Sequence, residues 1–365
     1  MYNEILKIIE GGLKGDKDRV ANYTKLFIKN LENEGNEKLA NKIAKILKSN
    51  NTRLVELDSF SSKPVDQDSR MEMVSVTIPT PNENNLIMNK FVKHEIEDFI
   101  SSYQNKEKLL LNNIEQSNKI LMYGKPGTGK TSLAHYISCQ VNLPLVTARL
   151  DGLVSSLLGN TAKNIRRIFD YAKKSPCVLF LDEFDVIAKI RDDKNELGEL
   201  KRVVNSLLQN IDDFDNGSIL VAATNHEQLL DPAVWRRFDK VIELPLPNDE
   251  ERNQIIKEYT KNLGNNFIED PKKLKSLIIS TSGFSPSDIK LVINNAIRKV
   301  VLKEKGELKN SHILYEIFLV NNRNLINEER LIIFLLKNGI SQREINLEYD
   351  ISLRKIRECS KKLEE

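Results

Sequence analysis

The chain has 365 residues, of which 40% are hydrophobic and 29% are charged. This composition excludes a disordered or fibrous protein, and the length leaves room for two or three packed domains. The formal net charge is only +3, so charge alone does not distinguish a nucleic-acid binder from an ordinary enzyme.

Two segments of different character occupy the first 85 residues. Residues 1–50 carry apolar side chains spaced mostly three and four apart and broken at glycines, which predicts about three short helices. Such a bundle would be either a stabilising or oligomerising cap or an adaptor that docks targets, and the sequence does not choose between them. Residues 51–85 are rich in Ser, Pro, Asp and Asn, which predicts a linker with one short strand in MVSVTI.

An alternation of helices and apolar runs begins at residue 86. A helix is predicted over 90–113, and short apolar runs follow at 119–123, 144–148, 177–181, 218–223 and 240–244. Near-continuous apolar strands that alternate with helices predict a parallel five-stranded sheet covered on both faces, and thus an α/β domain over 86–246. The helical residues 247–317 are predicted to form a separate small domain behind the sheet.

A glycine-rich loop follows the first of these strands and leads directly into a predicted helix. Residues 124–131 read GKPGTGKT and match the P-loop pattern GxxxxGK[ST] in the required strand, loop and helix context. Glycines let backbone N–H groups close around phosphate oxygens, and the helix N-terminus adds donors and a favourable dipole. Lys130 is expected to reach the β- and γ-phosphates of ATP, and Thr131 to ligate Mg²⁺. The expected ATP-binding residues are Gly124, Pro126, Gly127, Thr128, Gly129, Lys130, Thr131, Ser132 and Asp182.

Two acids, Asp182 and Glu183, follow the apolar run at 177–181. A buried strand of such a sheet emerges at its carboxyl end, beside the bound phosphates. Asp182 is therefore expected to hold the Mg²⁺ together with Thr131, and Glu183 to polarise the attacking water. An isolated acidic pair would be interpreted as a solvated helix cap, but the preceding P-loop favours the catalytic interpretation.

Polar residues also follow the fourth apolar run and precede the fifth. Asn225 is a neutral amide at the end of a strand, where it can bond the γ-phosphate or orient water. Arg236 and Arg237 precede the last strand, and a planar guanidinium delivered in trans stabilises phosphate charge in the transition state. The alternative for these arginines is a surface pair that binds nearby acids.

The P-loop, the LDE, ATN and RRFD motifs and GFSPSD over 283–288, in this order, resemble the AAA family of AAA+ ATPases. The resemblance covers roughly residues 85–310. It implies a sheet of strand order 5-1-4-3-2, a helical lid, an ATP site at a subunit boundary, and usually a hexamer whose pore grips a protein chain.

The sequence departs from this family pattern in two places. WRRFD is shorter than the usual RPGRFD, and we prefer Arg237 as the arginine that acts in trans because it directly precedes Phe-Asp. The expected pore triplet is Leu157-Leu158-Gly159, which lacks the aromatic ring of the family pattern. A leucine there would grip an extended chain less firmly.

The last segment, residues 318–365, is predicted to resemble a helix-turn-helix. A helix over 328–338 would end at Gly339, Ser341 would cap the next helix, and Ser352 would cap a final basic helix. In a DNA-binding protein the final helix would lie in the major groove. The favoured alternative is a helical bundle that packs on the lid or on a partner, with a basic solvated face.

Two functions remain open at this point. The leading one is an ATPase ring, a hexamer as the resemblance implies, that remodels, unfolds or delivers a protein substrate, with a separately encoded protease as one destination. The alternative is a nucleic-acid-directed ATPase, a loader or transposition-type helper that uses the tail to find DNA. Loaders often carry a sensing arginine early in the third lid helix, and none precedes Arg298 here, which favours the remodeller.

The compartment is predicted from what the sequence does not contain. Its three cysteines form no CxxC pair, so neither a disulfide framework nor a zinc site is predicted. No apolar run approaches the roughly 18 residues of a membrane helix. We therefore expect a cytoplasmic protein without a membrane partner.

Overall fold

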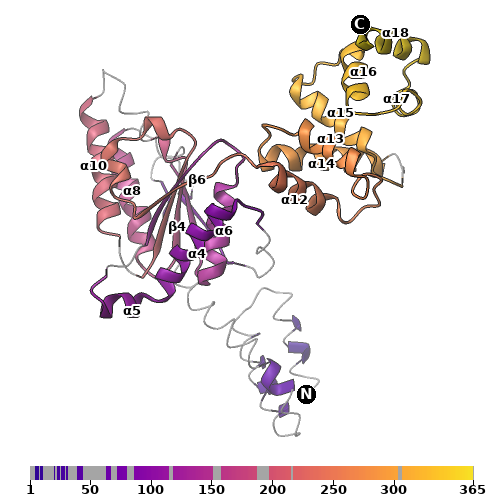
Figure 1. The fold of residues 1–365 in the computed structure, drawn as a ribbon. Coiled ribbons are helices and arrows are strands. Elements are labelled where there is room, and N and C mark those ends of the chain that lie inside the picture. The colour runs from indigo at the N-terminus through magenta and orange to yellow at the C-terminus, as the bar shows by residue number, and fades with distance from the viewer. Residues whose placement is uncertain are drawn as a thin grey trace.

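The computed structural model describes residues 63–66, 72–79, 86–114, 118–150, 158–186, 197–214, 217–302 and 306–364, with short pieces between residues 5 and 43 (Figure 1). The described residues of the N-terminal segment are all helical. The expected pore residue Leu157, and the side chains of Leu158 and Gly159, lie outside the described part of the chain.

A twisted sheet forms the centre of the larger domain. Its strands are β1 (Val74–Thr77), β2 (Lys119–Tyr123), β3 (Leu145–Arg149), β4 (Val178–Asp182), β5 (Ile219–Thr224) and β6 (Lys240–Glu243). Their spatial order is β1-β3-β4-β5-β2-β6, and the strands from β3 to β6 are parallel. If the five parallel strands β2 to β6 are numbered 1 to 5 in chain order, their spatial order read from β6 is 5-1-4-3-2. The predicted topology is therefore confirmed.

The sheet is one strand wider than predicted. Strand β1, from the segment interpreted as a linker, pairs antiparallel with β3, with Val74 opposite Ala148. Val74 is buried and Ser75 is exposed, so the alternation of MVSVT places an apolar face against the core. The sixth strand therefore protects an edge of the parallel sheet that would otherwise present unpaired backbone groups.

Helices cover both faces of the sheet, as the continuous apolar strands require. Helices α8 (Leu158–Ala172) and α10 (Leu197–Asp212) pack on one face, while α4 (Lys90–Gln104) and α6 (Lys130–Val141) pack on the other (Figure 1). In β4, Leu179 packs in the hydrophobic core under α8 and α10, and Phe180 packs in the core under α4 and α6. Successive side chains of a strand point to opposite faces of the sheet. Short helices α5 (Lys106–Leu111), α11 (Pro232–Trp235) and the 3-10 helix η3 (Glu227–Leu229) complete this domain.

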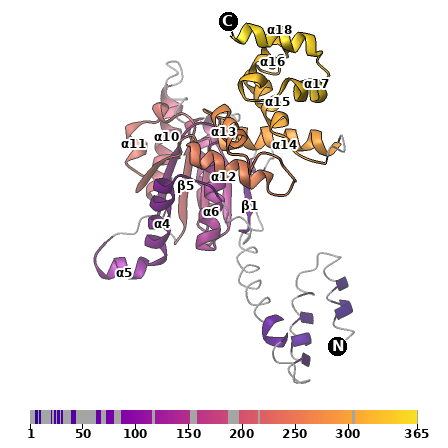
Figure 2. The same ribbon diagram turned by 45° about the vertical axis from the view of Figure 1, so that its right-hand side comes forward.

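The helices that follow β6 form a second body beside the carboxyl edge of the sheet. They are α12 (Asp249–Thr260), α13 (Pro271–Ser280), α14 (Pro286–Leu302), α15 (Asn310–Asn321), α16 (Glu328–Lys337), α17 (Gln342–Tyr349) and α18 (Leu353–Glu364). Figure 2 shows α16, α17 and α18 stacked on the side of this body that faces away from the sheet. Among the helices that the structure describes, none combines the length and apolar character needed to span a membrane.

The lid and the tail share one hydrophobic core. Ile255 of α12, Val292 of α14, Ile332 of α16 and Ile356 of α18 all belong to a single cluster of buried side chains. The boundary that was expected between residues 317 and 318 falls inside α15. The tail is thus packed on the lid through the same core that holds the lid together.

The turns of the tail follow the capping residues of the sequence. The Ser341 hydroxyl accepts a hydrogen bond from the Glu344 N–H at the start of α17. The Ser352 hydroxyl is 3.5 Å from the Lys355 N–H at the start of α18. Both serines satisfy N–H groups that have no partner within the first helical turn.

Candidate active site

The P-loop joins β2 to α6 at the carboxyl edge of the sheet. Gly124 has φ 145°, and a Cβ there would lie 2.3 Å from the Leu244 carbonyl oxygen at the end of β6. Gly127 has φ 77°, and a Cβ there would lie 2.5 Å from the Ser285 hydroxyl of the lid. Only glycine permits these close approaches, so the loop is fitted both to the sheet and to the lid.

Lys130 lies inside the curve of this loop. It is only 7% exposed, and its Nζ donates to the carbonyl oxygens of Gly124 at 2.7 Å and of Lys125 at 3.0 Å. Burial lowers the pKa of Lys130, and the charges of Asp182 and Asp185 oppose this shift. A buried cation that donates to loop carbonyls is suited to receive phosphate oxygens, which would compensate its charge more fully.

The first turn of α6 continues the cradle. Thr128 is buried and its hydroxyl donates to the Lys125 carbonyl at 2.9 Å, which closes the loop on itself. Thr131 and Ser132 are exposed in the first helical turn, where N–H groups have no helical partner. This arrangement fits a nucleotide phosphate chain, and the Thr131 hydroxyl together with Asp182 offers the oxygen ligands that Mg²⁺ prefers.

The acidic turn after β4 lies next to this cradle. Asp182 is the last residue of β4, and its Oδ1 accepts the Glu183 N–H at 2.9 Å. Glu183 has φ 54°, a left-handed conformation that non-glycine residues rarely adopt. The next N–H, that of Phe184, donates to the Ala223 carbonyl of β5 at 2.8 Å and fixes the turn against the neighbouring strand.

Asn225 follows β5 at the same edge of the sheet. In the register of β5 with β2, Thr224 stands opposite Tyr123, the residue that precedes the P-loop. Gly124 and Asn225 are therefore the residues that directly follow the ends of two adjacent strands. The structure thus brings together Lys130, Asp182, Glu183 and Asn225 from three neighbouring strands.

Asp185 is a residue at this edge that sequence reasoning missed. It is 4% exposed, and its Oδ1 accepts a hydrogen bond from the Thr224 hydroxyl at 3.2 Å. Its charge also acts on Lys130. The sequence feature that could have indicated Asp185 is its position as a third acid, two residues after Glu183, in a segment that is otherwise apolar.

The two arginines are not brought to the P-loop of their own chain. The Arg237 guanidinium lies 3.3 Å from the Asp212 carboxylate of α10 and donates to the Ala233 carbonyl at 2.8 Å. Two residues later, the Asp239 N–H bonds the carbonyl of Lys119, the first residue of β2. The Arg236 side chain is exposed and forms no hydrogen bond or ion pair with any described residue, while the Arg236 backbone N–H donates to the Val234 carbonyl. Both arginines precede a turn at the opposite end of the strands from the P-loop.

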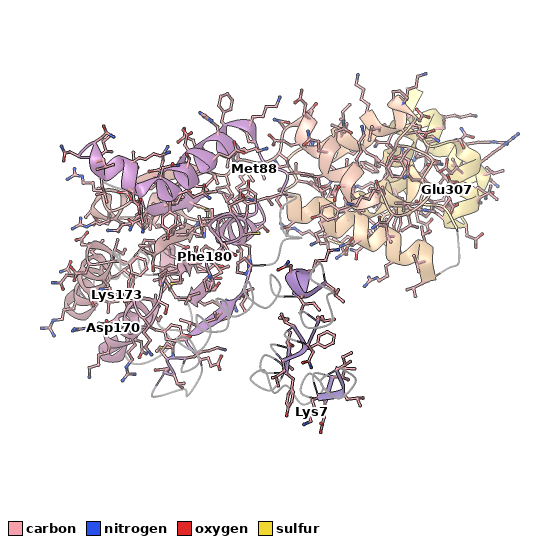
Figure 3. All side chains as sticks on the ribbon, turned by 90° about the horizontal axis from the view of Figure 1, so that it is seen from below. Lys7, Met88, Asp170, Lys173, Phe180 and Glu307 are labelled. Carbon is pink, nitrogen blue, oxygen red and sulfur yellow. The ribbon has the colours of Figure 1, made fainter. Side chains whose placement is uncertain are left out.

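A narrow pocket separates the P-loop from the lid. The Ser287 N–H at the start of α14 donates to the Gly127 carbonyl at 3.2 Å, and the Asn89 side chain donates to Glu251 of α12 at 3.1 Å. Met88 lies where the two bodies meet (Figure 3). Most of its lining residues are apolar, and its free volume is only about 30 Å³, the space of a single water. Its apolar lining includes Leu86, Met88, Leu133, Leu244, Ile255 and Pro286.

The fold and this site define a P-loop nucleotide hydrolase with a helical lid. Residues 120–246 match the family described as ATPase family associated with various cellular activities (AAA). A protein of Sinorhizobium fredii, described as an uncharacterized AAA family ATPase, is 32% identical over 313 residues, which are 84% of this chain and 91% of that protein. The chain therefore belongs to the AAA family of ATPases and is an ATP-hydrolysing enzyme.

Further relatives are archaeal. A putative 26S proteasome regulatory subunit homolog of Methanocaldococcus jannaschii is 35% identical over 190 residues, which are 51% of this chain and 50% of that protein. A proteasome-activating nucleotidase of Methanothermobacter thermautotrophicus is 35% identical over 202 residues, which are 53% of this chain and 48% of that protein. The chain thus spans about half the length of these two relatives.

Proposed function

We propose that this chain assembles into a ring, hydrolyses ATP between adjacent subunits, and uses the cycle to remodel a protein substrate. One observation carries the proposal: the P-loop, both acids and Asn225 converge at one edge of the sheet, whereas both arginines lie away from it. An arginine supplied by a second copy would complete this edge by stabilising the phosphate charge of the transition state.

In this proposal the residues of one subunit bind ATP and position water. The P-loop amides and Lys130 hold the phosphates, and Thr131 with Asp182 would hold Mg²⁺, which neutralises phosphate charge. Glu183 orients and polarises the attacking water, and Asn225 holds the γ-phosphate or that water without adding negative charge.

The contacts of the two arginines support Arg236 as the one that reaches the neighbouring site. Arg237, which the sequence alone favoured, is held in its own subunit by Asp212 and the Ala233 carbonyl. Arg236 is exposed. A partly exposed ion pair such as Arg237–Asp212 contributes only about 0–1 kcal/mol, so its main effect is to orient the short helix α11 that precedes both arginines.

A protein substrate is supported by the names of the archaeal relatives, which refer to the proteasome. Those names also support the further proposal of a separately encoded protease that receives the substrate. A hexameric ring and a cytoplasmic location are proposed from the family resemblance of the sequence. Leu157, Leu158 and Gly159 are proposed to contact the substrate, and the last two of them begin α8.

The alternative, a DNA-directed ATPase, rests on the basic helix α18, and the contacts of that helix weigh against it. Lys355 is paired with Glu328, Lys362 with Glu329 at 3.6 Å, and Arg354 with Glu358 at 3.1 Å. These acids lower the positive potential that a DNA phosphate would meet. Glu348 of α17 also bonds Lys309 of α15, which fixes the tail to the lid.

The proposal is tested by steady-state ATP turnover of the wild type and of Glu183→Gln over a range of protein concentrations. Each is measured alone, with an unfolded protein and with duplex DNA. We expect turnover per subunit to rise with concentration and with the unfolded protein, and to be lost in Glu183→Gln while ATP still binds. Stimulation by DNA alone would replace the remodeller by the alternative, and turnover that is independent of concentration would contradict the ring.

A further inference from the structure

We propose that Asp185 and Thr224 form a positioning pair that sets the geometry between Glu183 and Asn225. The inference rests on the proposed function, because it takes Glu183 as the water-polarising residue and Asn225 as its polar neighbour. Neither Asp185 nor Thr224 would contact ATP or water in this role.

The pair joins the two turns that carry the proposed catalytic side chains. Asp185 lies two residues after Glu183, and Thr224 directly precedes Asn225. The Thr224 hydroxyl donates to Asp185 Oδ1 at 3.2 Å and accepts the His226 N–H at 3.0 Å. One buried hydroxyl therefore fixes the acid on one turn and the backbone on both sides of Asn225.

The sheet itself does not fix this geometry. The register of β4 with β5 ends at Leu181 opposite Ala222, before either catalytic side chain is reached. Beyond that point, contacts such as the Phe184 N–H to Ala223 carbonyl bond hold the turns together. The left-handed backbone of Glu183 costs about 1–2 kcal/mol and persists only where its surroundings determine it.

Burial makes the contact between Asp185 and Thr224 consequential. Asp185 is 4% exposed and Thr224 is 0% exposed, so water cannot replace a lost hydrogen bond without rearrangement. Without the Thr224 hydroxyl this link between the two turns is lost, and the turn that carries Glu183 can shift relative to Asn225. Since a misplacement of about 1 Å can reduce turnover by about a hundredfold, we expect the loss in kcat and not in ATP affinity.

The test compares Thr224→Val with Thr224→Ser in ATP turnover. Valine has nearly the same shape but no hydroxyl, and we expect kcat to fall by at least about tenfold, with KM and the affinity for ATP within about twofold of wild type. Serine keeps the hydroxyl, and we expect it to retain most of kcat. The matched control is Thr260→Val, since Thr260 is also 0% exposed and its hydroxyl bonds the Ile256 carbonyl within α12.

Each outcome decides between the pair and a merely structural threonine. Wild-type kcat in Thr224→Val, an equal loss in Thr224→Ser, or an equal loss in Thr260→Val would overturn the inference. Glu183→Gln is measured in the same assay. If Glu183→Gln keeps its turnover, the proposed function fails; if it loses turnover while Thr224→Val does not, only the positioning pair fails.

Discussion

Single residues at the P-loop show how closely the lid and the nucleotide site are joined. A Cβ at Gly127 would lie 2.5 Å from the Ser285 hydroxyl and 3.0 Å from the Ser287 Cβ, and the Ser287 N–H donates to the Gly127 carbonyl. Ser285 and Asp288 cap α14 reciprocally, since each accepts a hydrogen bond from the other's N–H. The start of α14 is therefore a fixed surface, and a side chain on the P-loop could not push it aside at low cost.

Gly127→Ala is expected to weaken ATP binding and to destabilise the protein by about 1–2 kcal/mol, because alanine is strained at φ 77° and its Cβ would press on Ser285. Nucleotide titration and denaturant unfolding measure the two effects. Gly264→Ala is the control, since a Cβ at Gly264 meets no atom within 4 Å. If the two variants have equal ATP affinity and equal unfolding free energy, the close approach of Gly127 to the lid contributes nothing to binding or stability.

At the scale of secondary-structure elements, the local patterns predicted much of the fold. The P-loop, the five parallel strands and the caps Ser341 and Ser352 follow from periodicity and residue type within short windows. Contacts between distant segments could not be predicted in this way. The pairing of β1 with β3, the bond from Thr224 to Asp185, and the common core of lid and tail each depend on which side chains the fold brings together.

Helix α12 depends on such a contact at the junction of sheet and lid. Arg252 is buried, and its guanidinium donates to the carbonyls of Pro247 at 2.7 Å and Ile278 at 3.0 Å and to Asp249 at 2.7 Å. It thereby ties the connection after β6 to α13.

Arg252→Lys is expected to cost about 2 kcal/mol of unfolding free energy, because a single ammonium cannot reproduce the planar fork. Denaturant unfolding followed by circular dichroism measures this cost. Arg330→Lys, at an exposed position of α16, is expected to change stability by less than about 0.5 kcal/mol. If both variants unfold alike, Arg252 does not hold the junction.

At the scale of the whole molecule, the parts of the proposed site are divided between the two ends of the sheet. The P-loop follows Tyr123, the last residue of β2, while Asp239, just after the arginines, bonds Lys119, the first residue of that strand. A five-residue strand is roughly 15 Å long, so the turn that follows the arginines lies about that far from the P-loop end of β2. In the proposed ring, the far end of one subunit would meet the site of the next.

A mixing experiment tests this claim most directly. Glu183→Gln subunits keep their arginines, and subunits with Arg236→Ala and Arg237→Ala keep an intact Glu183, so each variant alone is expected to be inactive. When the two are mixed, some sites combine a complete P-loop edge with a neighbour's arginines, and we expect ATP turnover to reappear and to be highest near equal proportions. Mixed rings that form but remain inactive at every proportion, or an arginine variant that is fully active alone, would contradict hydrolysis between subunits.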